Sequence, residues 1–378
     1  MTEVMPAPQQ AAARMCASCP KMCRSACPTL AVTGNERHQP WGHARQVVEA
    51  MRDGEGFAAA EVVDGVYACA TCAACTVPCH VDGVETPELV WAARAAVHRM
   101  GATPRAGTEA VRAALAGQVP GEGGRPVDPA PVLAGLRALA TPGADLLLLP
   151  GCGTLGRRPQ AALAAARALR ALGVAFDVPE QHRCCGMPAL TFGDDPALEE
   201  MQSVLAGTLA DHPATTISVQ SPSCSWMLGV RHAPPGRAVE PLAATLARAL
   251  AARGEGAAGS AAGRRVAYHD PCYLARHQRR RDEPRAALAA TGHSLAELPG
   301  HGDTTQCSGQ GGGLPLTHPD IAAGYLQLLA GQVAAGGVDE VVSGCASCAA
   351  ALEDAGVHAL ELAEAVAAAL GAEEEPPR

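Results

Sequence analysis

Two cysteine-rich stretches are the most informative segments of this sequence: CASCPKMCRSACP at residues 16–28 and CATCAACTVPC at residues 69–79. Two or three residues separate neighbouring cysteines in each stretch, which lets their thiolates converge on one face of a cubane cluster. The last cysteine of each run follows after three intervening residues and can reach the cluster of the other run. The two runs predict two [4Fe-4S] clusters held by eight ligands: Cys16, Cys19, Cys23, Cys27, Cys69, Cys72, Cys75 and Cys79.

The two runs differ in spacing. The second has the bacterial ferredoxin spacing of two, two and three intervening residues, whereas the first has two, three and three. This difference favours a widened, helical ferredoxin unit, and the segment at 41–54, which ends on Asp53 and Gly54, has helical periodicity. A pair of structural zinc sites is the alternative, although zinc ligands usually come as two separated cysteine pairs. If the clusters cross-ligate, one is held by Cys16, Cys19, Cys23 and Cys79, and the other by Cys69, Cys72, Cys75 and Cys27.

The C-terminal half contains an internal repeat. DLLLLPGC ending at Cys152 matches RVAYHDPC ending at Cys272, and the Cys-Cys-Gly at 184–186 matches the Cys-Ser-Gly at 307–309. SPSC at 221–224 then matches CASC at 345–348, so that three landmarks recur in order at offsets of 120, 123 and 124 residues. We predict one cysteine-ligated metal site in each copy, with the ligands Cys152, Cys184, Cys185, Cys224, Cys272, Cys307, Cys345 and Cys348.

Hydrophobic runs alternate with helical patterns inside each copy. In the first copy we expect strands at about 144–149, 174–178 and 215–220, and helices at 158–172 and 195–211. This alternation predicts a small open α/β layer with its cysteines at the carboxyl ends of the strands, where ligand sites collect in such folds.

The predicted fold class is α+β and multidomain. A helical 4Fe-4S ferredoxin domain at residues 1–100 precedes a Pro- and Gly-rich linker at 101–143, in which one short helix fits. The two tandem α/β cysteine-rich repeats follow at 144–256 and 257–378, separated by GEGAAGSAAG at 254–263.

Three longer motifs resemble one known family. CCGMPALTFGD at 184–194, YHDPCYLAR at 268–276 and CSGQGGG at 307–313 are similar to the cysteine-rich CCG domains of heterodisulfide reductase B- and D-type subunits. Such domains also occur in iron-sulfur subunits of glycolate oxidase, lactate utilisation enzymes and anaerobic glycerol-3-phosphate dehydrogenase. The resemblance covers nearly the whole chain, and the layout is most similar to the glycolate oxidase iron-sulfur subunit.

The chain departs from the five-cysteine CCG pattern. The resemblance implies a noncubane cluster where five cysteines are present, but Ser221 and Ser308 replace one cysteine in the first and second copies, respectively. Four thiolates suffice for a cubane cluster or a zinc ion, so we expect one further iron-sulfur cluster or zinc ion per copy. Without the fifth cysteine, disulfide cleavage is a less favoured function, whereas the transfer of single electrons does not require it.

Other residues near the cysteines are expected to support the metal sites without ligating them. The glycines of SGQGGG at 308–313, together with Gly151 and Gly153, are expected to let backbone amides approach cluster sulfurs, because the segment lacks the lysine of a phosphate-binding loop. His182, His269 and Asp270 are expected to make supporting hydrogen bonds, with proton relay or ligand replacement as the alternative. No catalytic residue is assigned.

Composition restricts the function. The net charge of −9 without a basic block argues against nucleic-acid binding, and sixteen cysteines in a reducing compartment favour metal ligation over disulfides. The N-terminal residues lack the apolar core of a signal peptide, and no uncharged apolar run approaches the roughly 18 residues that a membrane span requires. We expect a cytoplasmic protein, with peripheral attachment to the inner face of the membrane as the alternative.

These observations predict an electron-transfer subunit of an oxidoreductase, not an autonomous catalyst. A FAD-containing dehydrogenase or oxidase subunit is the expected partner, because the chain has no flavin or nicotinamide fingerprint. The resemblance implies oxidation of a 2-hydroxy acid such as glycolate or lactate, with a quinone or other carrier as acceptor. One alternative is a disulfide or thiol reductase acting at the CCG sites, and another is a non-redox scaffold with structural zinc.

Overall fold

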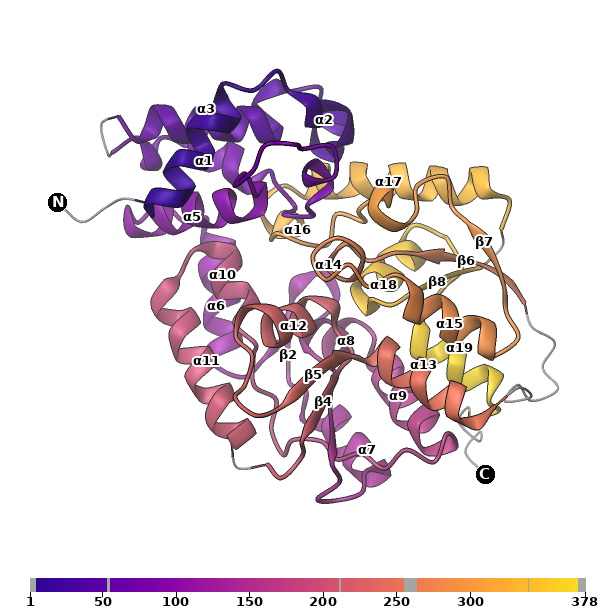
Figure 1. Ribbon diagram of the computed structural model, residues 1–378. Helices are drawn as coiled ribbons and strands as arrows, with labels where there is room; N and C mark the ends of the chain where they lie inside the picture. The colour runs from indigo at the N-terminus through magenta and orange to yellow at the C-terminus, as the bar shows by residue number, and fades with distance from the viewer. Residues whose placement is uncertain (1–4, 53–54, 211, 255–263, 339, 373–378) are drawn as a thin grey trace. The chain divides into compact units, whose positions relative to one another are not determined.

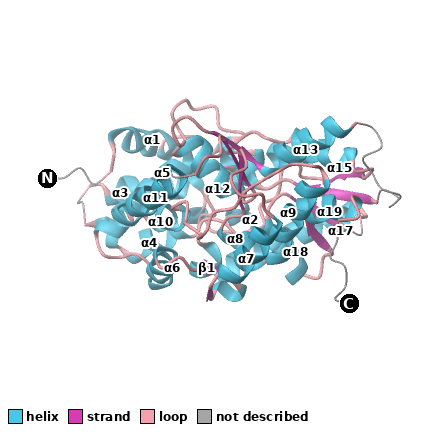
Figure 2. Cartoon of the chain, turned by 90° about the horizontal axis from the view of Figure 1, so that it is seen from below, coloured by secondary structure: helices cyan, strands magenta, loops and turns pink. Residues whose placement is uncertain are grey.

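The computed structural model describes residues 5–52, 55–210, 212–254, 264–338 and 340–372 (Figure 1). The chain divides into two compact units. The helical unit contains residues 1–115, 186–200 and 303–329, and the sheet unit contains residues 116–185, 201–302 and 330–378. Each unit therefore draws on segments that are far apart in the sequence. Figure 2 shows that helices make up most of the regular structure.

The helical unit starts with a bundle of short helices that carries the N-terminal cysteine runs. Proline lies in the first turn of several of them, where its fixed φ suits the helix and its missing N–H costs no hydrogen bond. The helices of this part are α1 (Ala7–Ala17), α2 (Pro28–Thr33), α3 (Pro40–Ala50), α4 (Ala60–Tyr67), α5 (Thr86–Arg99) and α6 (Arg105–Leu115). Short 3₁₀ turns η1 (Met22–Ala26) and η4 (Ala74–Thr76) carry the chain between cysteines. The helix predicted at 41–54 is α3, while Asp53 and Gly54 lie outside the described residues.

Two inserted segments complete the helical unit. The first contains α10 (Met187–Phe192) and the start of α11 (Asp195–Ala210), and the second contains α16 (Leu314–Thr317) and the start of α17 (Pro319–Gly336). Helix α10 packs against α5 and α6, and the Tyr67 hydroxyl of α4 donates a hydrogen bond to the Phe192 carbonyl oxygen over 3.1 Å. These contacts make the insertions part of the helical unit's core.

The sheet unit contains both cysteine-rich repeats, each built on a parallel sheet. In the first, the strand order is β3 (Leu146–Leu149), β4 (Thr216–Val219) and β5 (Ala238–Pro241). In the second, it is β7 (Ser294–Glu297), β6 (Arg265–His269), β8 (Val341–Ser343) and β9 (Ala359–Glu361). The α/β layer predicted for each repeat is confirmed.

The first repeat differs from the prediction at 174–178. That segment makes a single parallel bridge between Asp177 and Leu147 instead of a full strand. Pro179 follows two residues later and has no N–H to donate to a sheet ladder, so pairing cannot continue. The predicted helices at 158–172 and 195–211 are α9 (Pro159–Ala171) and α11, within one residue at each end.

One continuous hydrophobic core serves both repeats of the sheet unit. Helix α9 of the first repeat packs against α19 (Leu362–Ala369) of the second, and α13 (Leu242–Arg253) packs against α15 (Asp282–Ala290). Alanines such as Ala165 and Ala363 are fully buried, and their small side chains let the helices approach closely. The remaining helices of this unit are α7 (Ala130–Leu139), α8 (Cys152–Arg157), α12 (Pro222–Trp226), α14 (Cys272–Ala275) and α18 (Ala346–Asp354).

The segment at 101–143 contains more regular structure than the expected linker. It forms α6, a short antiparallel pairing of β1 (Val119–Pro120) with β2 (Pro126–Val127), and α7. Leu133 and Leu136 of α7 are buried in the core of the sheet unit. The spacing of apolar residues therefore determined the structure of this segment more than its Pro and Gly content did. The predicted separator at 254–263 lies, after Gly254, outside the described residues.

Candidate iron-sulfur sites

The structure gathers cysteines from both N-terminal runs around one cavity of the helical unit. The cavity has a volume of about 320 Å³ including its opening to solvent, and the cysteines that line it are Cys27, Cys69, Cys72 and Cys75. Cys27 lies between η1 and α2, whereas the other three follow α4. Thr71 and Ala73 flank Cys72 with φ of 50° and 58°, a left-handed conformation that costs roughly 1–2 kcal/mol per residue. These strained turns bend the loop around the cavity.

The other four N-terminal cysteines form a second group. Burial raises the pKa of Cys16 to about 12, and the neighbouring thiolates Cys23, Cys19 and Cys79 add to the increase. Cys16 lies at the end of α1, while Cys79 follows η4, which packs against η1. The structure thus places Cys79 with the first run and Cys27 with the second.

The chemistry of both groups fits iron-sulfur ligation. Burial raises the pKa of Cys27 to about 12 and that of Cys69 to about 11, so these thiols hold their protons at neutral pH. Thiols crowded in a buried cavity release these protons when they bind a cationic centre as thiolates. The Thr71 backbone amide also donates to the Cys69 Sγ over 3.4 Å, and such donors stabilise charge on a ligand sulfur.

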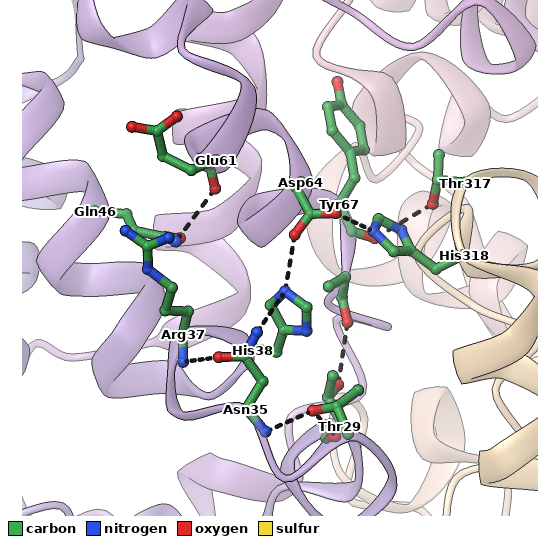
Figure 3. Close-up of polar contacts among 12 residues, drawn as sticks. Thr29, Asn35, Arg37, His38, Gln46, Glu61, Asp64, Tyr67, Thr317 and His318 are labelled. Atoms are coloured by element: carbon green, nitrogen blue, oxygen red, sulfur yellow. Dashed lines mark hydrogen bonds and ion pairs between the residues drawn. The ribbon is translucent and has the colours of Figure 1, made fainter.

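Polar contacts join the second inserted segment to α4 of the helical unit (Figure 3). Asp64 of α4 lies between two histidines, with Oδ2 2.9 Å from His38 Nε2 and Oδ1 3.1 Å from His318 Nε2. The hydroxyl groups of Thr29 and Tyr325 lie 2.6 Å apart, and Tyr325 lines the cavity. The segment at 303–329 is therefore fixed beside the cavity.

Cys307 of the second repeat belongs to this segment and is buried in the helical unit. Its Sγ accepts a hydrogen bond from the Gly309 amide over 3.4 Å. The pKa of the Tyr325 phenol is raised well above its usual range by burial and by nearby cysteines, which include Cys72 and Cys307. Cys272, Cys345 and Cys348 lie in the sheet unit, so a single site formed with Cys307 stays a prediction.

The four predicted cysteines of the first repeat all lie in the sheet unit. The Sγ atoms of Cys185 and Cys224 are 3.3 Å apart, and those of Cys152 and Cys184 are 3.9 Å apart. Cys152 starts α8 after β3, and Cys224 lies in α12 after β4, at the carboxyl ends of neighbouring parallel strands. Among the described residues, no group of three or more His, Cys, Asp or Glu side chains forms a ready-made single-ion site.

The three polar residues predicted to support the cysteines of the two repeats make different contacts. His182 Nε2 lies 3.1 Å from Cys152 Sγ, and burial lowers the His182 pKa against the opposing effect of the Cys184 thiolate. His269 instead contacts the Ser343 hydroxyl over 3.1 Å, and Asp270 accepts two 2.8 Å hydrogen bonds from Arg285. His182 therefore contacts the sulfur of a predicted ligand directly.

The first and second repeats touch near their cysteines inside the sheet unit. Gln278, which follows α14, donates from Nε2 to the Pro222 carbonyl over 3.0 Å and to the Ser225 hydroxyl over 2.9 Å. Trp226 of α12 packs edge-on against Tyr273, with ring centroids 5.5 Å apart. The helix carrying Cys224 therefore packs against the helix that begins at Cys272.

Gly151 is required by close packing in the first repeat. Its φ is +83°, and a Cβ there would lie 2.5 Å from Ser221 Cβ and 3.1 Å from Cys224 Sγ. The sequence-based interpretation, amide access to sulfur, missed this steric reason. Gly153 is similar, because its Cβ would lie 2.6 Å from the Ser347 Oγ.

We expect Gly151→Ala to abolish metal binding at the first repeat, because the added methyl group displaces Cys224. The matched control is Gly254→Ala, where φ is +84° and ψ is 176°, close to the φ of +83° and ψ of 160° at Gly151, and no atom lies within 4 Å of the new Cβ. That control imposes a similar backbone strain, of roughly 1–3 kcal/mol, without the clash. Metal analysis of the purified variants should show a loss for Gly151→Ala alone, and equal metal content in both would contradict the steric argument.

Comparisons with known proteins agree with this organisation. Residues 12–82 match a 4Fe-4S dicluster domain, and residues 146–229 and 266–353 each match the cysteine-rich CCG domain. The chain belongs to the iron-sulfur proteins that combine a 4Fe-4S dicluster domain with two cysteine-rich domains.

Three relatives illustrate the class. A probable membrane-anchored ferredoxin of Chromohalobacter salexigens is 31% identical over 84% of this chain and 50% of its own length. A fumarate reductase (CoM/CoB) subunit of Methanothermobacter marburgensis is 29% identical over 80% of this chain and 60% of its own length. A dihydromethanophenazine:CoB–CoM heterodisulfide reductase subunit of Methanosarcina mazei is 26% identical, over 78% and 74% respectively. The chain thus spans about half to three quarters of these relatives.

None of the helices in the described parts of the chain combines the length and apolar character needed to cross a membrane.

Proposed function

We propose that the chain is an iron-sulfur electron-transfer subunit of an oxidoreductase, with two [4Fe-4S] clusters in its helical unit. The observation that carries the proposal is the exchange of cysteines between the runs, with Cys27 beside Cys69, Cys72 and Cys75 around one cavity. This exchange is the ligation pattern of two-cluster ferredoxins. A bound cluster supplies a one-electron donor and acceptor, and the protein supplies thiolates, burial and hydrogen bonds to sulfur.

Each cysteine-rich repeat is proposed to hold one further iron-sulfur cluster or zinc ion. In the first repeat, the pairs Cys152–Cys184 and Cys185–Cys224 are close enough to share one centre. Ser221 lowers the Cys224 pKa through a hydrogen bond, after the larger effects of Cys152 and Cys185. The serine thus supports a thiolate at Cys224 where the family pattern has another cysteine.

The proposed partner is a FAD-containing dehydrogenase or oxidase subunit that oxidises a 2-hydroxy acid such as glycolate or lactate. The resemblance to glycolate oxidase iron-sulfur subunits supports this choice. Electrons would pass on to a quinone or another carrier. We place the protein in the cytoplasm or on the inner face of the membrane, and the name of the Chromohalobacter relative supports the second location.

A second candidate function is reduction of a disulfide or thiol conjugate at the cysteine-rich sites. The packing of α12 on α14 supports it, because the helices bearing Cys224 and Cys272 meet inside the sheet unit. Two relatives are named as a heterodisulfide reductase subunit and a fumarate reductase (CoM/CoB) subunit. Turnover of a disulfide with a chemical electron donor and no second protein would favour this function over relay.

The deciding experiment is iron, sulfide and zinc analysis with electron paramagnetic resonance on protein purified without oxygen. We expect about sixteen irons and no zinc, with separate signals lost in Cys185→Ser and Cys345→Ser. About eight irons with stoichiometric zinc would leave a two-cluster ferredoxin on a zinc-stabilised scaffold. Zinc in every site and no iron would contradict electron transfer altogether.

A further inference from the structure

Arg94 is a fully buried arginine at the centre of the helical unit. It lies on the buried side of α5, four residues after Val90 and three before Val97, and both of these valines are themselves fully buried. An arginine in a position that otherwise takes apolar residues costs several kcal/mol to desolvate, so it requires compensating contacts. Its position on this face could have been noticed in the sequence.

The Arg94 guanidinium group joins three separate segments. It donates from Nη2 to the Cys69 carbonyl oxygen over 2.7 Å, and from Nη1 to the Thr191 and Gly312 carbonyl oxygens, each over 3.0 Å. Its Nε donates to the Val66 carbonyl oxygen over 3.0 Å. These four acceptors are backbone carbonyl oxygens, and together they fix the orientation of the guanidinium group.

The Gly312 contact brings the Cys307 segment against the cysteine loop. A Cβ at Gly312, where φ is +64°, would lie 2.5 Å from the Cys69 carbonyl oxygen. Arg94 therefore holds two backbones that approach each other as closely as glycine allows. One of these backbones carries Cys69, and the other begins at Cys307, whose sulfur is buried in the same unit.

The charge of Arg94 acts on the cysteines of the cavity. The guanidinium group donates to the Cys69 carbonyl oxygen over 2.7 Å, so its positive charge lies beside the loop that carries a predicted cluster ligand and attracts negative charge there. The same attraction favours any added negative charge at that site, because a buried positive charge interacts strongly through a medium of low polarity. Reduction of a cluster adds one negative charge. Because arginine stays protonated in proteins, this effect does not depend on pH.

We propose that Arg94 is a positioning residue that sets the reduction potential of the centre held by Cys27, Cys69, Cys72 and Cys75. Its charge stabilises the reduced state, and its hydrogen bonds keep the Cys307 segment next to that centre. This inference rests on the proposed electron-transfer function and identifies the residue that makes the two N-terminal centres different in potential.

The test is an oxygen-free redox titration of the intact chain, followed by electron paramagnetic resonance. In Arg94→Gln, which keeps hydrogen-bond donors but loses the charge, we expect at least a tenfold lower equilibrium constant for one-electron reduction of this centre, or about 59 mV. The centre held by Cys16, Cys19, Cys23 and Cys79 should keep its potential, and iron content should be unchanged. Arg94→Lys, which keeps the charge, should stay close to wild type.

Arg99→Gln is the matched control, because Arg99 lies on the same helix but pairs with Asp195 at the surface over 3.2 Å. It should not shift either potential. Two unshifted potentials in iron-loaded Arg94→Gln would overturn the inference. If Arg94→Gln fails to retain iron, Arg94→Lys is the deciding variant. A wild-type potential supports the role of the positive charge, and a tenfold change in the equilibrium constant for reduction overturns it. Wild-type protein without cluster signals would contradict the proposed function as well, so the two failures are distinguishable.

Discussion

Replacing Cys27 by alanine is expected to remove the same cluster as replacing Cys72, although Cys27 belongs to the first cysteine run. About four irons per chain should be lost, together with one of the two cluster signals. The physical reason is the cavity, which brings Cys27 to Cys69, Cys72 and Cys75. Cys79→Ala should in turn remove the cluster of Cys16, because the Cys79 thiolate acts on Cys16.

Double variants make this expectation sharp. Cys27→Ala combined with Cys72→Ala should lose no more iron than Cys72→Ala alone, because both changes act on one centre. Cys27→Ala combined with Cys19→Ala should lose both clusters, or about eight irons. The reverse pattern, with Cys27 and Cys19 acting as one unit, would show that each run binds its own cluster and would refute the exchange. Iron and sulfide analysis of the three proteins distinguishes the two patterns.

Arg158→Met is expected to destabilise the sheet unit by about 3 kcal/mol, because it leaves a buried carboxylate without its partner. Arg158 is 3% exposed and donates from Nε to Glu364 Oε2 over 2.6 Å. It also pairs with Glu353 and donates from Nη2 to the Ala359 carbonyl oxygen over 2.9 Å. This one side chain, next to α9 of the first repeat, therefore joins that repeat to the C-terminal part of the second.

The loss should grow with pH. Burial raises the Glu364 pKa in the folded protein, and Arg158 opposes that rise, so the variant should have a still higher Glu364 pKa. When folding raises the pKa of a carboxyl group, the folded protein loses stability as the pH rises from the pKa of the unfolded chain, about 4.3, toward the pKa in the folded protein. The defect of Arg158→Met should thus be smaller at pH 5 than at pH 8.

Hydrogen exchange of α9 and α19 at the two pH values measures this effect locally. Arg157→Met is the matched control, because its partner Asp354 is 65% exposed and such surface pairs contribute about 1 kcal/mol or less. Adding Glu364→Gln to Arg158→Met should recover part of the loss and remove its pH dependence. Equal protection in the Arg157 and Arg158 variants would show that the buried network does not hold the repeats together.

Local sequence was sufficient for the features that depend on near neighbours. Helix α9 and strand β4 lie within one residue of their expected ends, since apolar periodicity acts over one or two turns. The three landmarks of the repeat also identified the two α/β layers, and Cys152 and Cys224 follow strands as predicted, whereas among the described residues Cys184 and Cys185 follow no strand and Cys307 lies in the helical unit. The linker at 101–143 was underestimated because Pro and Gly content concealed the apolar faces of α6 and α7.

The sequence by itself determined the division of the cysteines into N-terminal runs and C-terminal repeats and most of the secondary structure that presents them, and it predicts that these cysteines act as ligands. Only the tertiary structure decided that residues 186–200 and 303–329 join the helical unit, and that Cys307 is buried there. It also decided that Arg94 reaches Gly312, 218 residues away. No local periodicity encodes such a contact, because its free energy comes from burying surfaces and pairing polar groups that meet after the chain has folded.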